Sequence, residues 1–143
     1  MDVGARSAST SAVVEEFLRR TREGDPDRIA ELYAETVDWR VSWPEPRHPA
    51  VPWIRPRSTR ADVADHYRVF GETCVPDEGS VTLEQITVDG PHAFLVGASS
   101  QVVRPTGRRF TMSFVLRLTI EEGLITAHHM YEDSLAVLRA FEG

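Results

Sequence analysis

The chain has 143 residues, of which 41% are hydrophobic and 27% charged, a composition typical of one globular domain with a real core. The 16 lysines and arginines are outnumbered by 22 acidic residues, and this net charge of −6 argues against a nucleic-acid-binding protein. The single cysteine, Cys74, excludes an intrachain disulfide, and no apolar run reaches membrane-spanning length. We expect a cytoplasmic protein with no nucleic-acid and no membrane partner.

The N-terminal segment is predicted to be a tail followed by a helix. Residues 1–10 are small and polar, so we expect them to be disordered and residues 11–143 to form the single domain. Thr10 or Ser11 can cap a helix, because hydrophobic residues then recur at helical spacing as far as about Arg22.

Two more helices are predicted in the first half of the chain. Asp25-Pro26 combines a capping aspartate with a proline that suits the first helical turn, and this helix is expected to include Tyr33 on its buried side. Thr59 and Asp62 have the spacing of a capping box and predict a third helix.

Between the second and third helices the pattern changes to that of a strand and then a loop. Trp39, Val41 and Trp43 alternate with polar residues, which is typical of a half-buried strand. The segment 44–57 contains five prolines and predicts a long loop. It is either a lid over a binding site, which Trp53 would suit, or an inert connection.

The second half of the chain predicts a sheet. Turn residues separate four strands, at roughly 81–88, 92–103, 108–120 and 124–132, and a short last helix follows. Helices segregated to one face of a mostly antiparallel sheet define an α+β domain. A sheet of this size is expected to curl around a cavity that the helices close, and the small residues 97–100 either leave room for a ligand or mark a bend.

Five segments carry a resemblance to a known family. They are Arg22-Glu23-Gly24-Asp25, Leu32-Tyr33-Ala34 leading into Val37-Asp38-Trp39-Arg40-Val41, Gly107-Arg108-Arg109-Phe110, Gly123-Leu124-Ile125-Thr126 and Tyr131-Glu132-Asp133. In this order, over nearly the whole chain, they resemble the SnoaL-like branch of the nuclear-transport-factor-2-like superfamily, which also includes ketosteroid isomerase. The resemblance implies a cone-shaped, curved antiparallel sheet wrapped around the N-terminal helices, and a homodimer through the outer sheet face. It implies no single activity, because one fold hosts isomerases, cyclases, dehydratases, epoxide hydrolases and non-catalytic binders.

The catalytic apparatus of ketosteroid isomerase has no counterpart in this chain. By resemblance, its oxyanion-hole tyrosine falls on Phe17, its aspartate base on Val41 and its oxyanion acid on Phe114. All three positions are apolar here, so we do not expect proton shuttling by that apparatus.

The last predicted strand carries the main catalytic candidates. Side chains alternate along a strand, so His128, Met130 and Glu132 are expected to face the cavity. His129 and Tyr131 then point outward. The resemblance places the acidic catalytic residue of SnoaL-like cyclases at Met130, which leaves its neighbours His128 and Glu132. His128 is a general base or a hydrogen-bonded cavity residue, and Glu132 is a supporting polar group or a carboxylate at the solvent-exposed rim.

The remaining candidates are on the third helix and on the cavity wall. Tyr67 is a third catalytic candidate, with its hydroxyl either in the cavity or in the core, and His66 is beside it. The predicted substrate-binding residues are Phe17, Trp39, Val41, Trp43, Trp53, His66, Phe94, Met112, Phe114 and Met130. Neither a metal nor another cofactor is expected, because His128 and His129 face opposite sides and no phosphate-binding loop occurs.

The sequence therefore predicts a cofactor-independent SnoaL-like enzyme that acts on an apolar, oxygenated small molecule, such as a polyketide-type metabolite, by general acid/base catalysis. The reaction is a cyclisation, isomerisation, dehydration or epoxide opening. The alternative is a non-catalytic module of the same fold that binds a small molecule or a second protein chain.

Overall fold

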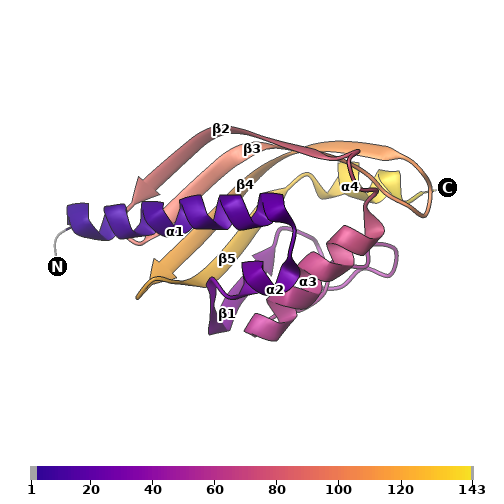
Figure 1. The fold of residues 1–143 in the computed structure, drawn as a ribbon. Coiled ribbons are helices and arrows are strands. Elements are labelled where there is room, and N and C mark those ends of the chain that lie inside the picture. Colours follow the sequence, from indigo (N-terminus) through magenta and orange to yellow (C-terminus); the bar gives the residue numbers. More distant parts are fainter. Residues whose placement is uncertain (1–2, 143) are drawn as a thin grey trace.

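The computed structural model describes residues 3–142, with side chains from Ala8 onward. Its elements are α1 (Val3–Glu23), α2 (Pro26–Ala30), β1 (Tyr33–Val41), α3 (Arg60–Thr73), β2 (Ser80–Asp89), β3 (His92–Val102), β4 (Arg109–Glu121), β5 (Leu124–Glu132) and α4 (Ser134–Ala140). The helix α1 lies across one face of the curved sheet, and α2 and α3 lie beside it (Figure 1). The expected α+β architecture, with a curved sheet wrapped around N-terminal helices, is confirmed.

The sheet is mixed rather than fully antiparallel. Its strand order is β1-β5-β4-β3-β2, and the strands β2 to β5 form the antiparallel meander that the sequence predicts. The first strand joins the far edge and runs parallel to β5, with Trp39 opposite His128. A parallel pair needs a long crossover connection, and the chain makes it through α3 and the whole meander.

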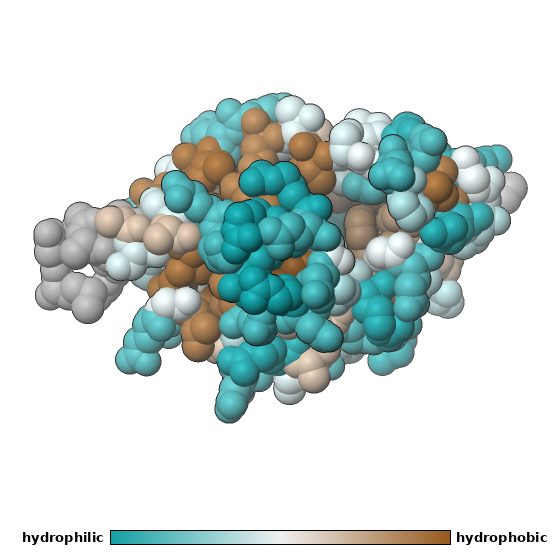
Figure 2. Space-filling view, viewed as in Figure 1, coloured by the Kyte–Doolittle hydropathy of each residue, from teal (hydrophilic) through white to brown (hydrophobic). Residues whose placement is uncertain are grey.

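The helices cover the concave face of the sheet and leave the other face open. The helix α1 packs against β2 and β3, and α3 packs against β1 and α2. The core under them combines side chains from helices and strands, among them Val14, Phe17, Tyr33, Leu118 and Ile125. In the space-filling view, the outward surface of the C-terminal half of α1 is hydrophilic, while hydrophobic atoms show above and below it (Figure 2). This is the pattern of an amphipathic helix that shields an apolar interior.

Two predicted helix boundaries are wrong. The helix α1 begins at Val3 rather than at Ser11, and residues 1 and 2 of the predicted tail lie outside the described residues. The side chain of Thr10 is buried and donates to the Gly90 carbonyl oxygen at 2.7 Å, so this residue ties α1 to the β2–β3 turn instead of capping the helix. Tyr33 begins β1 rather than ending α2.

The predicted caps of α2 and α3 are confirmed. The Asp25 side chain accepts hydrogen bonds from the backbone of Asp27 and Arg28. Thr59 and Asp62 form both bonds of a capping box at the start of α3. These local bonds satisfy backbone N–H groups that have no partner inside a helix.

The second half of the proline-rich segment 44–57 packs against the domain, while residues 44–50 are largely exposed. Val51, Trp53 and Ile54 are each at most 4% exposed. The Trp53 ring contacts Phe70 at a centroid distance of 4.8 Å and Phe141 at 5.5 Å. The segment therefore closes one end of the domain and is not an inert connection.

The small residues of β3 include one that the sheet requires. A Cβ atom on Gly97 would lie 2.2 Å from the backbone oxygen of Thr82 on β2. The register of the β2–β3 pair shifts just beyond Thr82, between Leu83 and Gln85. Gly97 thus allows a close approach of two strands at an irregular, bent part of the sheet.

Candidate active site

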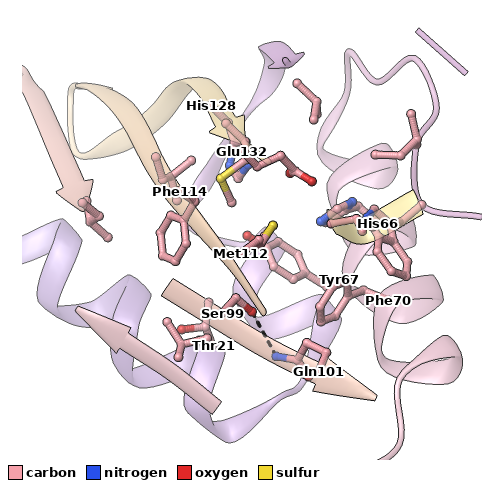
Figure 3. A pocket seen from close by; sticks show the side chains of 18 of the residues that line it. Thr21, His66, Tyr67, Phe70, Ser99, Gln101, Met112, Phe114, His128 and Glu132 are labelled. Atoms are coloured by element: carbon pink, nitrogen blue, oxygen red, sulfur yellow. Dashed lines mark hydrogen bonds between the residues drawn. The ribbon is translucent and has the colours of Figure 1, made fainter. Parts of the chain in front are cut away.

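A cavity of about 310 Å³ lies between the concave face of the sheet and the helices α1 and α3 (Figure 3). Its lining is largely apolar. The lining residues are Phe17, Leu18, Thr21, Trp39, Val41, Trp53, Ile54, His66, Tyr67, Phe70, Val81, Leu83, Leu95, Ser99, Gln101, Phe110, Met112, Phe114, Leu116, His128, Met130, Glu132 and Val137. Apolar cavities with a few convergent polar groups are the usual form of a small-molecule site.

Every predicted site residue except Trp43 and Phe94 lines this cavity. The prediction for Phe94 is wrong. Side chains alternate along β3 and Leu95 points into the cavity, so Phe94 points to the open face of the sheet, opposite Arg117. Trp43 lies just beyond the end of β1, and its indole nitrogen donates to Glu132 Oε2 at 3.2 Å. Trp43 therefore contacts a cavity residue without lining the cavity itself.

The inward and outward faces of β5 are as predicted. His128, Met130 and Glu132 line the cavity, while the Tyr131 side chain is 51% exposed. His129 points to the open face, where its Nε2 atom lies 3.0 Å from Asp38 Oδ2. His128 and Glu132 are four residues apart, which is about 13 Å along the strand. They can therefore contact different parts of one ligand.

The imidazole of His128 is held in place by two aromatic residues. Its ring stacks on Trp39, with centroids 3.8 Å apart and planes inclined by 8°. Its Nδ1 atom shares a hydrogen bond with the Tyr33 hydroxyl at 2.8 Å. Burial lowers the pKa of His128 well below its ordinary value, and the nearby His66 and His129 add to this effect. The ring is therefore neutral at physiological pH.

Tyr33 links His128 to Tyr67. The two tyrosine hydroxyls lie 3.3 Å apart, and Tyr67 lines the cavity while Tyr33 is completely buried behind it. Burial raises the pKa of Tyr67 to about 12 and raises the pKa of Tyr33 well above its ordinary value, so both hydroxyls are protonated. In the tautomer in which Tyr33 donates to Nδ1, the proton of the neutral ring is on Nε2, and this N–H group is left to donate toward the cavity.

Glu132 is a partly buried carboxyl rather than a free rim carboxylate. Burial raises its pKa, the Trp43 hydrogen bond partly opposes this, and the negative charge of Asp133 adds to it. Its backbone N–H donates to Ser42 Oγ at 2.8 Å, which ties the end of β5 to the end of β1. The carboxyl group extends into the hollow toward the side where His66 lies (Figure 3).

His66 is a second neutral imidazole on the cavity wall. Burial lowers its pKa to about 3, and the positive charge of Arg57 contributes to this shift. Its ring meets the edge of Trp39 at a centroid distance of 4.7 Å. Neither His66 Nδ1 nor Trp39 Nε1 has a hydrogen-bond partner among the described residues.

Three residues that the sequence analysis did not select, Tyr33, Ser99 and Gln101, have polar groups at the site. Tyr33 was expected on a helix, and no pattern in the sequence around it predicts its contact with His128. Ser99 and Gln101 belong to the strand predicted at 92–103, and their side chains point into the cavity. Within residues 3–142, no group of three histidine, cysteine or acidic side chains is close enough to hold a metal ion. None of the described helices is long and apolar enough to cross a membrane.

The fold is shared with several solved structures of low sequence identity. An NTF2-like protein from Burkholderia thailandensis is 18% identical over 94% of this chain and 98% of its own, with a TM-score of 0.78. TerC, co-crystallised with polyporic acid, is 13% identical over 94% and 99%, with a TM-score of 0.76. An LEH-like epoxide hydrolase from Mycobacterium tuberculosis is 14% identical over 94% and 90%, with a TM-score of 0.70.

No functionally curated protein matches the sequence. The family model of the SnoaL-like domain, by contrast, matches residues 14–128, which include the C-terminal part of α1, the strands β1 to β4 and the first half of β5. Together with the NTF2-like fold, this match confirms the resemblance seen in the sequence. The chain belongs to the SnoaL-like domain family.

Proposed function

We propose that the protein is a cofactor-independent enzyme that acts on an apolar, oxygenated small molecule, such as a polyketide-type metabolite, by general acid/base catalysis. One observation carries the proposal. A carboxyl group with a raised pKa and a neutral imidazole project from the same face of β5 into a cavity that is otherwise largely apolar. Titratable groups shifted by burial inside a pocket are typical of acid/base sites.

Glu132 is the group that exchanges the proton. A carboxyl whose pKa is raised can hold or release a proton closer to neutral pH than an exposed one. His128 is too weak a base to take a proton in neutral solution, so its role is to donate a hydrogen bond from Nε2 to an oxygen that becomes negative. Tyr67 supports that role through Tyr33 and faces the ligand itself.

The reactions that suit these groups are cyclisation, isomerisation, dehydration and epoxide opening. In each, a proton moves while charge develops on a substrate oxygen, and no cofactor is required. The likeness of the fold to an epoxide hydrolase, and to TerC with its bound polyporic acid, supports this range of chemistry. The aromatic wall formed by Trp39, Trp53 and Phe114 suits a flat, apolar ligand.

The test uses two probes of known chemistry, 1-tetralone and styrene oxide. Exchange of the tetralone α-protons in D₂O is followed by NMR, and epoxide opening is followed by chromatography. We expect turnover of at least one probe, lowered by about 10²- to 10⁴-fold in Glu132→Gln. Glu121→Gln, an exposed carboxylate at the end of β4, is the matched control and should leave the rate unchanged.

Two outcomes contradict the proposal. Equal rates for Glu132→Gln and the wild type remove Glu132 from the mechanism. Binding of both probes without any turnover favours the alternative, a non-catalytic binding module. The apolar residues Phe17, Val41 and Phe114, at the positions of the ketosteroid isomerase catalytic residues, also favour this alternative.

A homodimer through the open face of the sheet is a second part of the proposal. Strand pairing aligns Val96, Val115 and Tyr131 in one row across this face, and Tyr131 is 51% exposed. An apolar row on a sheet face without helices suits burial against a second copy. Light scattering after size-exclusion chromatography should give the mass of a dimer, and Tyr131→Arg should shift it toward the monomer. A monomer mass for the wild type at every concentration contradicts this part.

A further inference from the structure

Two groups of polar side chains lie on opposite sides of the cavity. His66, His128 and Glu132 lie on one side, while Ser99 and Gln101 lie across the cavity on β3 (Figure 3). Ser99 and Gln101 are 6% and 9% exposed, although the residues opposite them on β4, Met112 and Phe110, are apolar. The second group is not used by the mechanism proposed above.

Ser99 and Gln101 keep unused hydrogen-bonding capacity. Gln101 Nε2 donates to Ser99 Oγ at 3.2 Å, and this is the one hydrogen bond of either side chain to another described residue. The Ser99 hydroxyl proton and the Gln101 carbonyl oxygen therefore remain available. Buried polar groups are normally paired, so this pair is suited to a polar group of a ligand.

The Gln101 side chain lies where the cavity adjoins a second hollow. This second hollow, of about 640 Å³, lies between the C-terminal ends of α1 and α3 and the start of β2. It shares six residues with the cavity, namely Leu18, Thr21, Phe70, Val81, Leu83 and Gln101. The two hollows therefore adjoin along these residues, and Gln101 lies at their boundary.

Gly79 makes this position of Gln101 possible. A Cβ atom on residue 79 would lie 2.1 Å from Gln101 Oε1. Gly79 lines the outer hollow, and its missing side chain leaves the space that the Gln101 carbonyl oxygen occupies. The amide is thus held between Gly79 and Ser99 rather than free to swing into solvent.

The register of the sheet sets the distance between the two polar groups. Ser99 lies opposite Met112, which is two residues from Phe114, and Phe114 lies opposite Glu132. Two strand spacings and two residue rises separate the backbone of Ser99 from that of Glu132 by about 12 Å. A small molecule can therefore contact both polar groups at once.

We propose that Ser99 and Gln101 form a second polar subsite, which binds a hydroxyl or carbonyl group at the end of the substrate nearest the outer hollow. The inference rests on the proposed function and narrows its substrate class. The substrate is an elongated molecule with an apolar body and an oxygen at each end. One oxygen meets Glu132 and His128, and the other meets Ser99 and Gln101.

The test compares the affinities of two probes, 4-hydroxybiphenyl and 4,4′-dihydroxybiphenyl, by isothermal titration calorimetry. The wild type should bind the dihydroxy compound about 3- to 10-fold more tightly, because a second hydrogen bond forms at the subsite. The double variant Ser99→Ala/Gln101→Leu should bind both compounds equally. Thr111→Val is the matched control, since the Thr111 hydroxyl lies outside the cavity, on the other face of β4, where it donates to Ser100 Oγ, and it should keep the wild-type preference.

Equal affinity of the wild type for the two phenols, failure to bind either, or an unchanged preference in the double variant overturns the subsite. Thermal melting of each variant shows whether it folds, and Gln101→Met repeats the measurement with a flexible side chain of similar size. The measurement needs no turnover, so it is separate from the test of the proposed function. A preference that persists without any catalysis would keep the subsite and reject the enzyme.

Discussion

Tyr33 controls the orientation of His128. Its hydroxyl is completely buried and lies within hydrogen-bonding distance of both His128 Nδ1 and the Tyr67 hydroxyl. Because one face of the imidazole also stacks on Trp39, the ring has little freedom to turn. A residue that touches no ligand thus decides which nitrogen of His128 faces the cavity.

Replacing Tyr33 by phenylalanine tests this role. Tyr33→Phe leaves Nδ1 without its partner, so we expect the free energy of unfolding in urea to fall by about 1–3 kcal/mol. Turnover should fall as well, and the ¹⁵N shifts of His128 should report a changed tautomer. Tyr67→Phe is the comparison, since it keeps the 2.8 Å bond, and it should preserve those shifts. Wild-type shifts in Tyr33→Phe would contradict the positioning role.

The element that differs most from an ordinary connection is the segment 44–57. Long loops without regular structure are uncommon in compact domains, and they persist where their own side chains pack. Here Trp53 is 4% exposed and inserts among rings from α3, β4 and the C-terminal end. The segment also ends in Arg57, which donates to Asp65 Oδ2 and to the Asp62 carbonyl on α3.

Truncating Trp53 should therefore affect both stability and the cavity. We expect Trp53→Ala to lower the free energy of unfolding by about 3–5 kcal/mol, because it removes a large buried ring. Trp43→Ala, on the half-buried tryptophan that precedes the segment, should cost less. Chemical denaturation of the two variants checks the difference. Equal losses of unfolding free energy in the two variants would show that the packing of Trp53 does not stabilise the domain more than that of Trp43.

At the scale of the whole molecule, two neutral histidines make the fold sensitive to acid. His66 has a pKa of about 3 in the folded protein against 6.5 for an ordinary histidine, and the pKa of His128 is lowered as well. Between these pH values the unfolded chain binds more protons than the folded one. Stability is therefore fully present above pH 6.5 and falls as the pH drops toward 3.

The variant His66→Phe isolates one of these contributions. Each such group changes the free energy of unfolding by about 1.4 kcal/mol per pH unit inside its window. From pH 7 to pH 5, the wild type should lose about 2 kcal/mol more than His66→Phe in urea denaturation. Parallel pH profiles for the two proteins would contradict a neutral, buried His66.

Local patterns predicted much of the fold. The capping residues Asp25 and Thr59, the turns between the last four strands and the alternation along β5 were all readable, because each depends on residues close in the chain. The errors arose where a contact between residues far apart in the chain decided the structure. Thr10 looked like a cap but bonds to Gly90 eighty residues away, and Phe94 was assigned to the wrong face of its strand.

The amino-acid sequence by itself determined the family, the order of helices and strands, and the inward direction of His128 and Glu132. These follow from backbone geometry, in which side chains repeat every two residues in a strand and about every four in a helix. Only the tertiary structure decided that β1 joins β5 in parallel, that Tyr33 and Trp39 hold His128, and that Ser99 and Gln101 face Glu132 across the cavity. Those contacts depend on strand register and sheet curvature, which set the distances between residues far apart in the chain.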